Sequence, residues 1–166
     1  FIRPFGFKGG YLTESWQTVS SLENPSGNFQ GIGLSTQSVL WSDAGVFASH
    51  SESGGNALMF ALQEHALQLL KNTTFTNPIN MLDNILNDVH EYGKRITKRP
   101  DLRLTFALNS LVGVDNAAWM LYAKENGLAS FDEIIPEEYH PALSCRHELL
   151  ASIPLMAYGI PLNEIV

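Results

Sequence analysis

Five consecutive turn-forming residues, Asn24-Pro25-Ser26-Gly27-Asn28, do most to limit what this chain can fold into. Residues of these types supply the fixed or positive φ angles that reverse the direction of a chain. The five residues separate Leu12–Leu22, which mixes β-branched, aromatic and polar residues, from Phe29–Leu34, which carries apolar residues at several positions. Both flanking segments are typical of strands. The pattern therefore predicts an antiparallel β-hairpin, against which the rest of the chain must pack.

Three long segments with helical periodicity follow the hairpin. The first is Asn56–Leu70, whose leucines and alanines recur near helical spacing. The second begins at Asn77-Pro78, a helix cap followed by a proline at the first helical position. The third is Leu104–Asn126, and Gly127 after it suits a helix C-cap. Strands followed by helices predict an α+β domain with a three-helix bundle.

The last part of the chain changes character. Ser130 is placed to cap a short helical turn over Phe131–Ile135, and a polar connection follows. Ser152–Ile160 then has the apolar composition of a buried strand, with no second strand after it. Because the backbone groups of a strand must be paired, we expect this segment to join a sheet or a barrel.

Composition excludes several classes of function. The chain has 166 residues and a net charge of −7, which argues against a nucleic-acid partner. No apolar run approaches the roughly 18 residues that span a membrane. A single cysteine, Cys145, allows no internal disulfide and favours a cytoplasmic setting. Charged residues make up only 16%, which suggests that another domain or subunit covers part of the surface.

The third helical segment carries a pattern that is similar to one in a known family. Its spacing resembles the last capping-domain helix of the enolase superfamily, in the branch of mandelate racemase and muconate lactonizing enzyme. The matching residues are Val114, Asp115, Ala117, Trp119, Ala123, Lys124 and Gly127. Phe131–Ile135 lies where that family has a short turn, and Ile153–Gly159 resembles its first barrel strand. Met120 replaces the usual acid, and Pro136–Leu150 replaces a Gly-Gly, so the chain resembles an outlying subgroup.

The resemblance implies a domain organisation. Residues 1–127 would be an enolase-like capping domain, residues 128–150 a connection, and residues 151–166 the start of a (β/α) barrel whose remainder is absent. Pro4–Gly10 resembles the mobile loop between the first two capping strands. Gly31–Leu34 resembles the third strand, and Ser35–Trp41 the second specificity loop.

The family's shared chemistry implies what the whole protein would do. A base removes the proton α to a carboxylate, and Mg²⁺ stabilises the enediolate that forms. Racemases, epimerases, cycloisomerases and acid-sugar dehydratases all use this step, so the fold does not identify the substrate. The five lysines of this chain form no Lys-x-Lys pair. We therefore expect no catalytic residue and no metal ligand here, with the Mg²⁺ ligands beyond residue 166 and the chain alone inactive.

By the same resemblance, this chain would supply specificity through two lid loops. The first offers Phe7, Lys8 and Tyr11, where Lys8 either pairs with a substrate carboxylate or is a solvated surface lysine. Gly9-Gly10 favours mobility in that loop. The second offers Ser35, Thr36, Gln37, Ser38 and Trp41. Asp115, Trp119 and Lys124 would form a structural motif, with a hydrogen-bond partner expected for Asp115. The implied partners are a small carboxylate substrate, the rest of the barrel and further copies in a homo-oligomer.

A second hypothesis comes from a different class of protein. The chain could instead be a complete, non-catalytic α+β binding or interaction module. Pairing of Ser152–Ile160 with the Leu12–Leu34 hairpin would favour the module, and its separation from that hairpin would favour the capping domain.

Two weaker motifs carry no function. Gly31-Ile32-Gly33 lacks the third glycine of a dinucleotide loop, and His140, Cys145 and His147 are too few for a closed zinc site.

Overall fold

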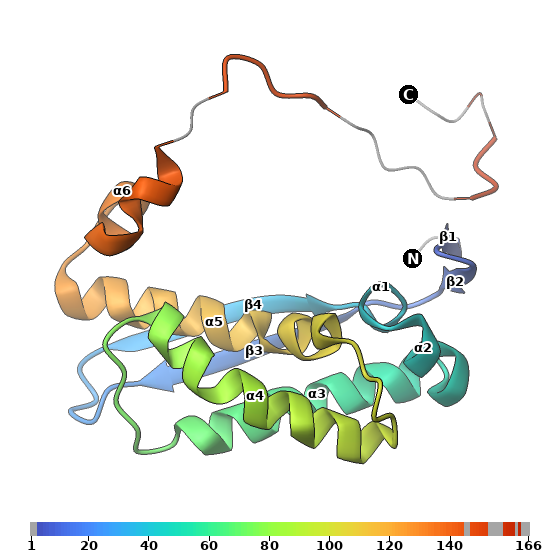
Figure 1. Ribbon diagram of the computed structural model, residues 1–166, viewed down its shortest axis with the longest axis horizontal. Helices are drawn as coiled ribbons and strands as arrows, with labels where there is room; N and C mark the ends of the chain where they lie inside the picture. The colour runs from blue at the N-terminus through green and yellow to red at the C-terminus, as the bar shows by residue number, and fades with distance from the viewer. Residues whose placement is uncertain (1–2, 145–146, 153–157, 162, 164–166) are drawn as a thin grey trace.

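The chain folds into an α+β structure with two small antiparallel sheets and several helices (Figure 1). A computed structural model describes residues 3–144, 147–152, 158–161 and 163. The strands are β1 (Phe5–Phe7), β2 (Gly10–Leu12), β3 (Trp16–Glu23) and β4 (Gln30–Gln37). The helices are α1 (Val39–Ser42), α2 (Ala44–His50), α3 (Glu52–Leu70), α4 (Pro78–Thr97), α5 (Leu104–Asn126), α6 (Phe131–Ile134) and the 3₁₀ helix η1 (Glu137–Leu143).

The predicted hairpin is confirmed as β3 and β4. The two strands pair in antiparallel register from Trp16 opposite Gln37 to Glu23 opposite Gln30. The turn between them is closed by the Asn24 amide, which donates to the Phe29 carbonyl at 3.1 Å. Gly27 has a φ of +71° within the turn, a value that favours glycine.

The three long helices are also confirmed. α3 begins at Glu52, four residues before the predicted start at Asn56. Asn77 caps α4, because its Oδ1 accepts the Asn80 amide at 2.8 Å. Gly127 ends α5 in a left-handed conformation, with a φ of +66°. The predicted cap on the short turn is present as well, since Ser130 forms a reciprocal capping box with Glu133.

Two short helices, α1 and α2, were not predicted. They follow β4 directly, and buried Asp43 lies between them. Asp43 caps α2, because its Oδ1 accepts the amides of Gly45 and Val46 at 2.9 and 3.1 Å. Its Oδ2 accepts the Arg103 amide at 3.0 Å, which ties α2 to the start of α5.

The hydrophobic core lies between α3, α4 and α5. Its largest side chains with almost no exposure include Phe106, Met59, Leu62, Met81 and Leu111. Full burial of a side chain of this size stabilises the fold by about 2 kcal/mol relative to exposure. The core accounts for the mutual packing of the three long helices that the apolar periodicity predicted.

The second strand of the hairpin lies directly on the backbone of α5. A Cβ atom at Gly33 would lie 2.0 Å from the Gly113 carbonyl oxygen and 2.4 Å from the Ala117 nitrogen. A Cβ at Gly31 would lie 2.0 Å from the Ala117 carbonyl oxygen. No side chain fits at either position, so the two glycines allow strand and helix to touch.

Side chains of α5 also cover the outer edge of β4. Asn109 donates to the carbonyl of Thr36 at 3.2 Å, and Asn116 donates to that of Leu34 at 2.8 Å. Lys124 donates to the carbonyl of Gln30 at 2.7 Å. Three outward carbonyls of β4 are therefore hydrogen-bonded by side chains of a helix rather than by another strand.

The predicted terminal strand, Ser152–Ile160, falls largely outside the described residues. The structure describes Ser152 and Tyr158–Ile160 within it. Tyr158 donates its amide to the Gly6 carbonyl at 3.0 Å, which forms an isolated antiparallel bridge. The described bridge thus joins β1, not the hairpin of β3 and β4.

Substitution of Gly33 tests the contact between β4 and α5. Gly33→Ala is expected to lower the free energy of unfolding by about 3 kcal/mol, because its methyl group forces strand and helix apart. Gly54→Ala is the control, since its Cβ would lie 3.2 Å from the Ser51 hydroxyl and 3.7 Å from the His50 Cβ, with no backbone atom of another described element within 4 Å. In the helix it is expected to be neutral or to stabilise by up to about 1 kcal/mol. Urea denaturation measures both, and equal effects of the two substitutions would contradict the close contact.

Candidate functional site

The first predicted lid loop is in fact a tight hairpin, so the expectation that Pro4–Gly10 forms a loop between two strands was wrong. β1 and β2 pair in antiparallel register, with Phe7 opposite Gly10. The two residues between them, Lys8 and Gly9, have φ values of +51° and +82°. Two successive positive φ angles are typical of a type I′ turn, which favours a twisted two-stranded hairpin. The glycines here serve turn geometry and close packing.

The second predicted lid loop, Ser35–Trp41, is also regular structure rather than a loop. Ser35, Thr36 and Gln37 belong to β4, and Trp41 belongs to α1. Ser38 lies between the two elements, half-buried, and its amide donates to Asn109 Oδ1 at 3.1 Å. The resemblance implied a loop here, but the glycines Gly31 and Gly33 let this strand lie directly on α5.

Two of the predicted ligand-contacting residues are buried in the protein. Ser35 shares a hydrogen bond of 2.7 Å with Thr18 between their hydroxyl oxygens. Gln37 donates from Nε2 to Gln63 Oε1 at 3.2 Å, and Gln63 donates to Ser20 Oγ at 2.6 Å. These side chains form a polar layer between the hairpin and the helices. They are not available at the surface to bind a substrate.

The structure does bring parts of the two predicted segments together at one end of the molecule. Lys8 donates from Nζ to the Trp41 carbonyl oxygen at 2.9 Å, across 33 residues of sequence. Gly10 is close to the side chains of Leu40 and Phe47, as a Cβ there would lie 3.1 and 3.2 Å from them. The hairpin of β1 and β2 is thereby fixed beside α1 and α2 (Figure 1).

The exposed members of this group define the candidate site. Tyr11 is 57% exposed and Trp41 is 49% exposed. Lys8 is also exposed, and it joins the two segments through its bond to Trp41. Phe7 is half-buried and lies 6.4 Å from the Phe5 ring, centroid to centroid. Thr36 is exposed but belongs to the hairpin of β3 and β4. We call Lys8, Tyr11 and Trp41 the exposed aromatic–lysine group.

No sequence pattern indicated the hydrogen bonds that hold this end in place. Glu52 Oε2 accepts the amide and the hydroxyl of Thr13, at 2.9 and 2.6 Å. Glu14 accepts the Trp16 indole at 3.1 Å and the Ser53 hydroxyl at 2.6 Å. These bonds tie the β2–β3 connection to the start of α3, and no local pattern predicts them because the partners are 39 residues apart.

The predicted structural motif on α5 makes the contacts that such a role requires. Trp119 donates a hydrogen bond to the half-buried Asp115 carboxylate one turn earlier, so the partner expected for Asp115 exists. Trp119 also packs edge-on against Tyr122, with ring centroids 6.1 Å apart. Lys124 holds the edge of β4, as described above. Burial raises the pKa of Asp115 above its ordinary value of 3.8, and the bond from Trp119 opposes that rise.

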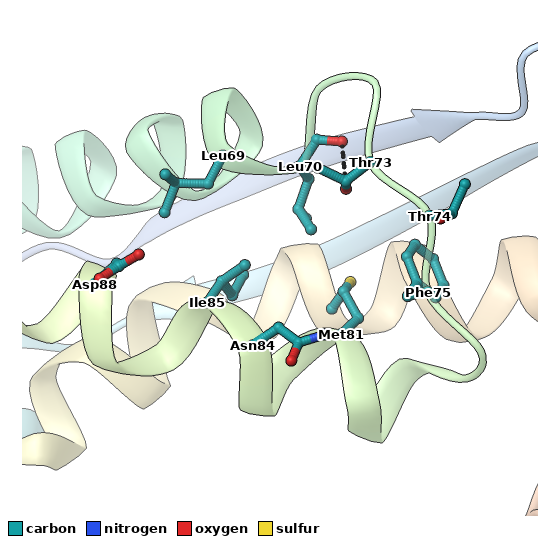
Figure 2. Close-up of a pocket in the computed structure, with 9 residues that line it drawn as sticks. All are labelled: Leu69, Leu70, Thr73, Thr74, Phe75, Met81, Asn84, Ile85 and Asp88. Atoms are coloured by element: carbon teal, nitrogen blue, oxygen red, sulfur yellow. Dashed lines mark hydrogen bonds between the residues drawn. The ribbon is translucent and has the colours of Figure 1, made fainter.

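A separate cavity lies at the opposite end of the long helices. Figure 2 shows its lining, which comes from the end of α3, the following connection and α4. Its volume is about 240 Å³, and its residues are Leu69, Leu70, Thr73, Thr74, Phe75, Met81, Asn84, Ile85 and Asp88. Thr73 Oγ1 donates to the Leu70 carbonyl at 2.9 Å, so this hydroxyl is engaged within the chain. Asp88 has no second acid or base among the lining residues, which leaves the cavity without a catalytic pair.

Searches of the described residues for metal sites and membrane segments give no candidate. Within residues 3–144 and the shorter described stretches, no three His, Cys, Asp or Glu side chains are grouped to hold a metal ion. The helices of the same residues include none that is long and apolar enough to cross a membrane. Comparison of the chain with protein-family models, curated proteins and solved structures finds no match.

The raised pKa of Asp115 predicts a pH-dependent contribution to stability. At a pH below the ordinary pKa, the Asp115 carboxyl is protonated in both the folded and the unfolded chain. As the pH rises from there through the higher pKa of the folded state, the folded state loses stability relative to the unfolded chain. Asp115→Asn keeps an acceptor for Trp119 and cannot ionise. Its stability relative to the wild type is therefore expected to rise between about pH 4 and pH 7.

Urea midpoints across this pH range measure the effect. Asp83→Asn, which removes an exposed acid on α4, controls for the loss of one charge. A difference between Asp115→Asn and wild type that stays constant or falls with pH would contradict the assignment.

Proposed function

We propose that this chain is the capping and specificity domain of a metal-dependent isomerase or lyase that removes the proton α to a carboxylate. The reaction class includes racemases, epimerases, cycloisomerases and acid-sugar dehydratases. The observation that carries the proposal is the Lys8–Trp41 hydrogen bond, which holds the two segments assigned to the lid at one end of the domain. A lid built from two distant segments requires such a contact.

The exposed aromatic–lysine group suits recognition of a small carboxylate. Lys8 has three ammonium donors, and the Trp41 carbonyl accepts one of them. The others can reach a carboxylate, and a charge-assisted bond of that kind is stronger than a neutral one. Tyr11 and Trp41 add flat apolar surface beside the charge. In this proposal Lys8, Tyr11 and Trp41 replace the longer set of lid residues expected from the sequence.

The contacts of α5 support the family assignment. In the motif that resembles the enolase superfamily, Asp115 and Trp119 bond to each other, and Lys124 binds the edge of β4. Asp115, Trp119 and Lys124 of the motif therefore each make a structural contact in this fold. The proposal divides the chain into a capping domain over residues 1–127, a connection over residues 128–150 and the start of a barrel over residues 151–166.

The metal and the catalytic base belong outside the described part of the chain in this proposal. The described residues do not fit a Mg²⁺ site, because they hold no group of suitable ligands. When bound elsewhere in such an enzyme, Mg²⁺ stabilises the enediolate. The role of the present residues is to bind the substrate, to exclude water and to hold the substrate's distal carboxylate.

The alternative function is a non-catalytic binding or interaction module. One observation favours it: the outer face of the hairpin exposes Val19, Ile32 and Leu34, which are 65%, 53% and 65% exposed. Exposed apolar patches mark interaction surfaces. The same patch also suits the capping domain, where the barrel or another subunit of a homo-oligomer would cover it.

The coding sequence after Val166 distinguishes the two functions. The capping proposal predicts a Lys-x-Lys pair and acids at the ends of successive strands within roughly the next 150 residues, as a (β/α) barrel requires. It also predicts that the encoded protein exchanges the α-proton of a carboxylate with deuterium from D₂O when Mg²⁺ is added.

A coding sequence without these residues would contradict the proposal. Absence of exchange that persists across a panel of hydroxy acids, dipeptides and sugar acids would count against it as well. The matched control is the same protein after removal of Mg²⁺ with a chelator.

A further inference from the structure

The outer edge of β3 is unpaired, and the register shows which of its backbone groups are free. Asn24 and Phe29 are hydrogen-bonded across the turn. From there along the hairpin, opposite residues alternate between pairs that are not hydrogen-bonded to each other and pairs that are. In agreement, the carbonyls of Gln30, Leu34 and Thr36 point away from β3, toward α5. The residues opposite these on β3 therefore direct their backbone groups outward, and so does Ser21, which has the same place in the alternation. The outward residues are Gln17, Val19, Ser21 and Glu23.

Within the described part of the chain, these outward groups have no hydrogen-bond partner on the backbone or on side chains. β3 is eight residues long and lacks proline, lysine and arginine, the residues that commonly protect an exposed edge. The outer edge of β4 differs, because three side chains of α5 hydrogen-bond to its carbonyls. Among the described residues, the outer edge of β3 has no such side chains along it and is open to a further strand.

An apolar surface lies beside the open edge. Gln63 of α3 reaches β3, where it donates to Ser20 at 2.6 Å. Phe60 and Leu67 lie three residues before and four residues after Gln63, so they share its side of the helix. Phe60 is 50% exposed and Leu67 is half-buried. A strand added to β3 would place alternate side chains toward Phe60 and Leu67, and the others beside Val19.

The charges around the edge select the kind of strand that fits. β3 and α3 together contain Glu23, Glu52 and Glu64 and no lysine or arginine. Glu52 is bonded to Thr13, whereas Glu23 and Glu64 are exposed. Basic residues in the added strand would therefore be attracted to this side of the domain.

A second copy of the chain does not suit this edge. If the β3 strands of two copies paired, each copy would bring its own α3 along with its β3. The two α3 helices would then compete for the space beside the joined strands. Each copy also carries a net charge of −7, which opposes their approach. A single extended segment without a helix beneath it avoids both problems.

We propose that the open edge of β3, on the side of α3, binds an extended segment of another protein, in which apolar residues alternate with basic and small polar residues. Backbone hydrogen bonds to Gln17, Val19, Ser21 and Glu23 would hold the segment. Val19, Phe60 and Leu67 would contact its apolar side chains, and Glu23 and Glu64 its basic ones. This site is distinct from the exposed aromatic–lysine group.

A fluorescent eight-residue peptide, in which valine alternates with lysine and threonine, is the probe. Fluorescence anisotropy is expected to show binding that weakens when salt is added and at least tenfold when glutamate replaces lysine. Val19→Pro removes one outward N–H without removing a β3–β4 bond, and it is expected to weaken binding at least tenfold. Val19→Thr keeps the N–H and the branched side chain, and it is expected to bind within about threefold of wild type.

Circular dichroism and urea midpoints establish that each variant is folded. If Val19→Pro does not fold, Ser21→Pro removes another outward N–H and takes its place. NMR shift changes on adding the lysine peptide that are confined to β3 and the Phe60 side of α3 would support binding at the β3 edge. The proposal is overturned if the lysine peptide fails to bind at about 1 mM, if folded proline variants bind like wild type, or if the shift changes lie elsewhere. Formation of a dimer through β3 in sedimentation experiments would also overturn it.

Discussion

The rest of the structure depends on the direct contact between the backbone of β4 and that of α5. Gly31 and Gly33 have no room for a Cβ atom, because the carbonyls of Ala117 and Gly113 lie where it would be. This contact places α5 close enough to β4 for its side chains to reach the strand's carbonyls. It also leaves α5 in position to pack against α3 and α4 through Phe106 and Leu111.

The close approach explains the polar layer beneath the hairpin. Small and polar side chains fill the remaining space, including Thr18 and Ser35, whose hydroxyls are 2.7 Å apart. If β4 stays on α5, a shift of the register by one residue would turn Val19 toward the helices and separate these hydroxyls. The layer therefore specifies one register. Among the described residues one hydrogen-bond acceptor of this layer is left over, because the buried oxygen Gln37 Oε1 has no partner.

The elements that were predicted well from the sequence are those marked by residues close to them in the chain. The turn at Asn24–Asn28, the cap at Asn77 and the end at Gly127 each depend on residues adjacent to the feature they define. The α+β class followed from their order. α1 and α2 were missed because their position depends on Asp43, which bonds to the distant Arg103 amide.

The candidate site was harder to predict because its contacts are not local. Ser35 and Gln37 look like loop residues by composition, and only the position of Gly31 and Gly33 on α5 shows that they are buried. The Lys8–Trp41 bond spans 33 residues, and nothing near either residue indicates the other. The resemblance to the enolase superfamily named both segments, but it assigned them as loops where the chain forms a hairpin, a strand and a short helix.

The central claim is that side chains of α5 bind three outer carbonyls of β4, whereas the outer edge of β3 is open. Amide hydrogen exchange, followed residue by residue by NMR in the free protein, tests it most directly. The outward amides of Val19 and Ser21 are predicted to exchange close to the rate of an unstructured chain, and the inward amides of Ser20 and Leu22 to be strongly protected. Equal protection of all four amides would contradict the claim, because it would mean that the edge of β3 is already covered.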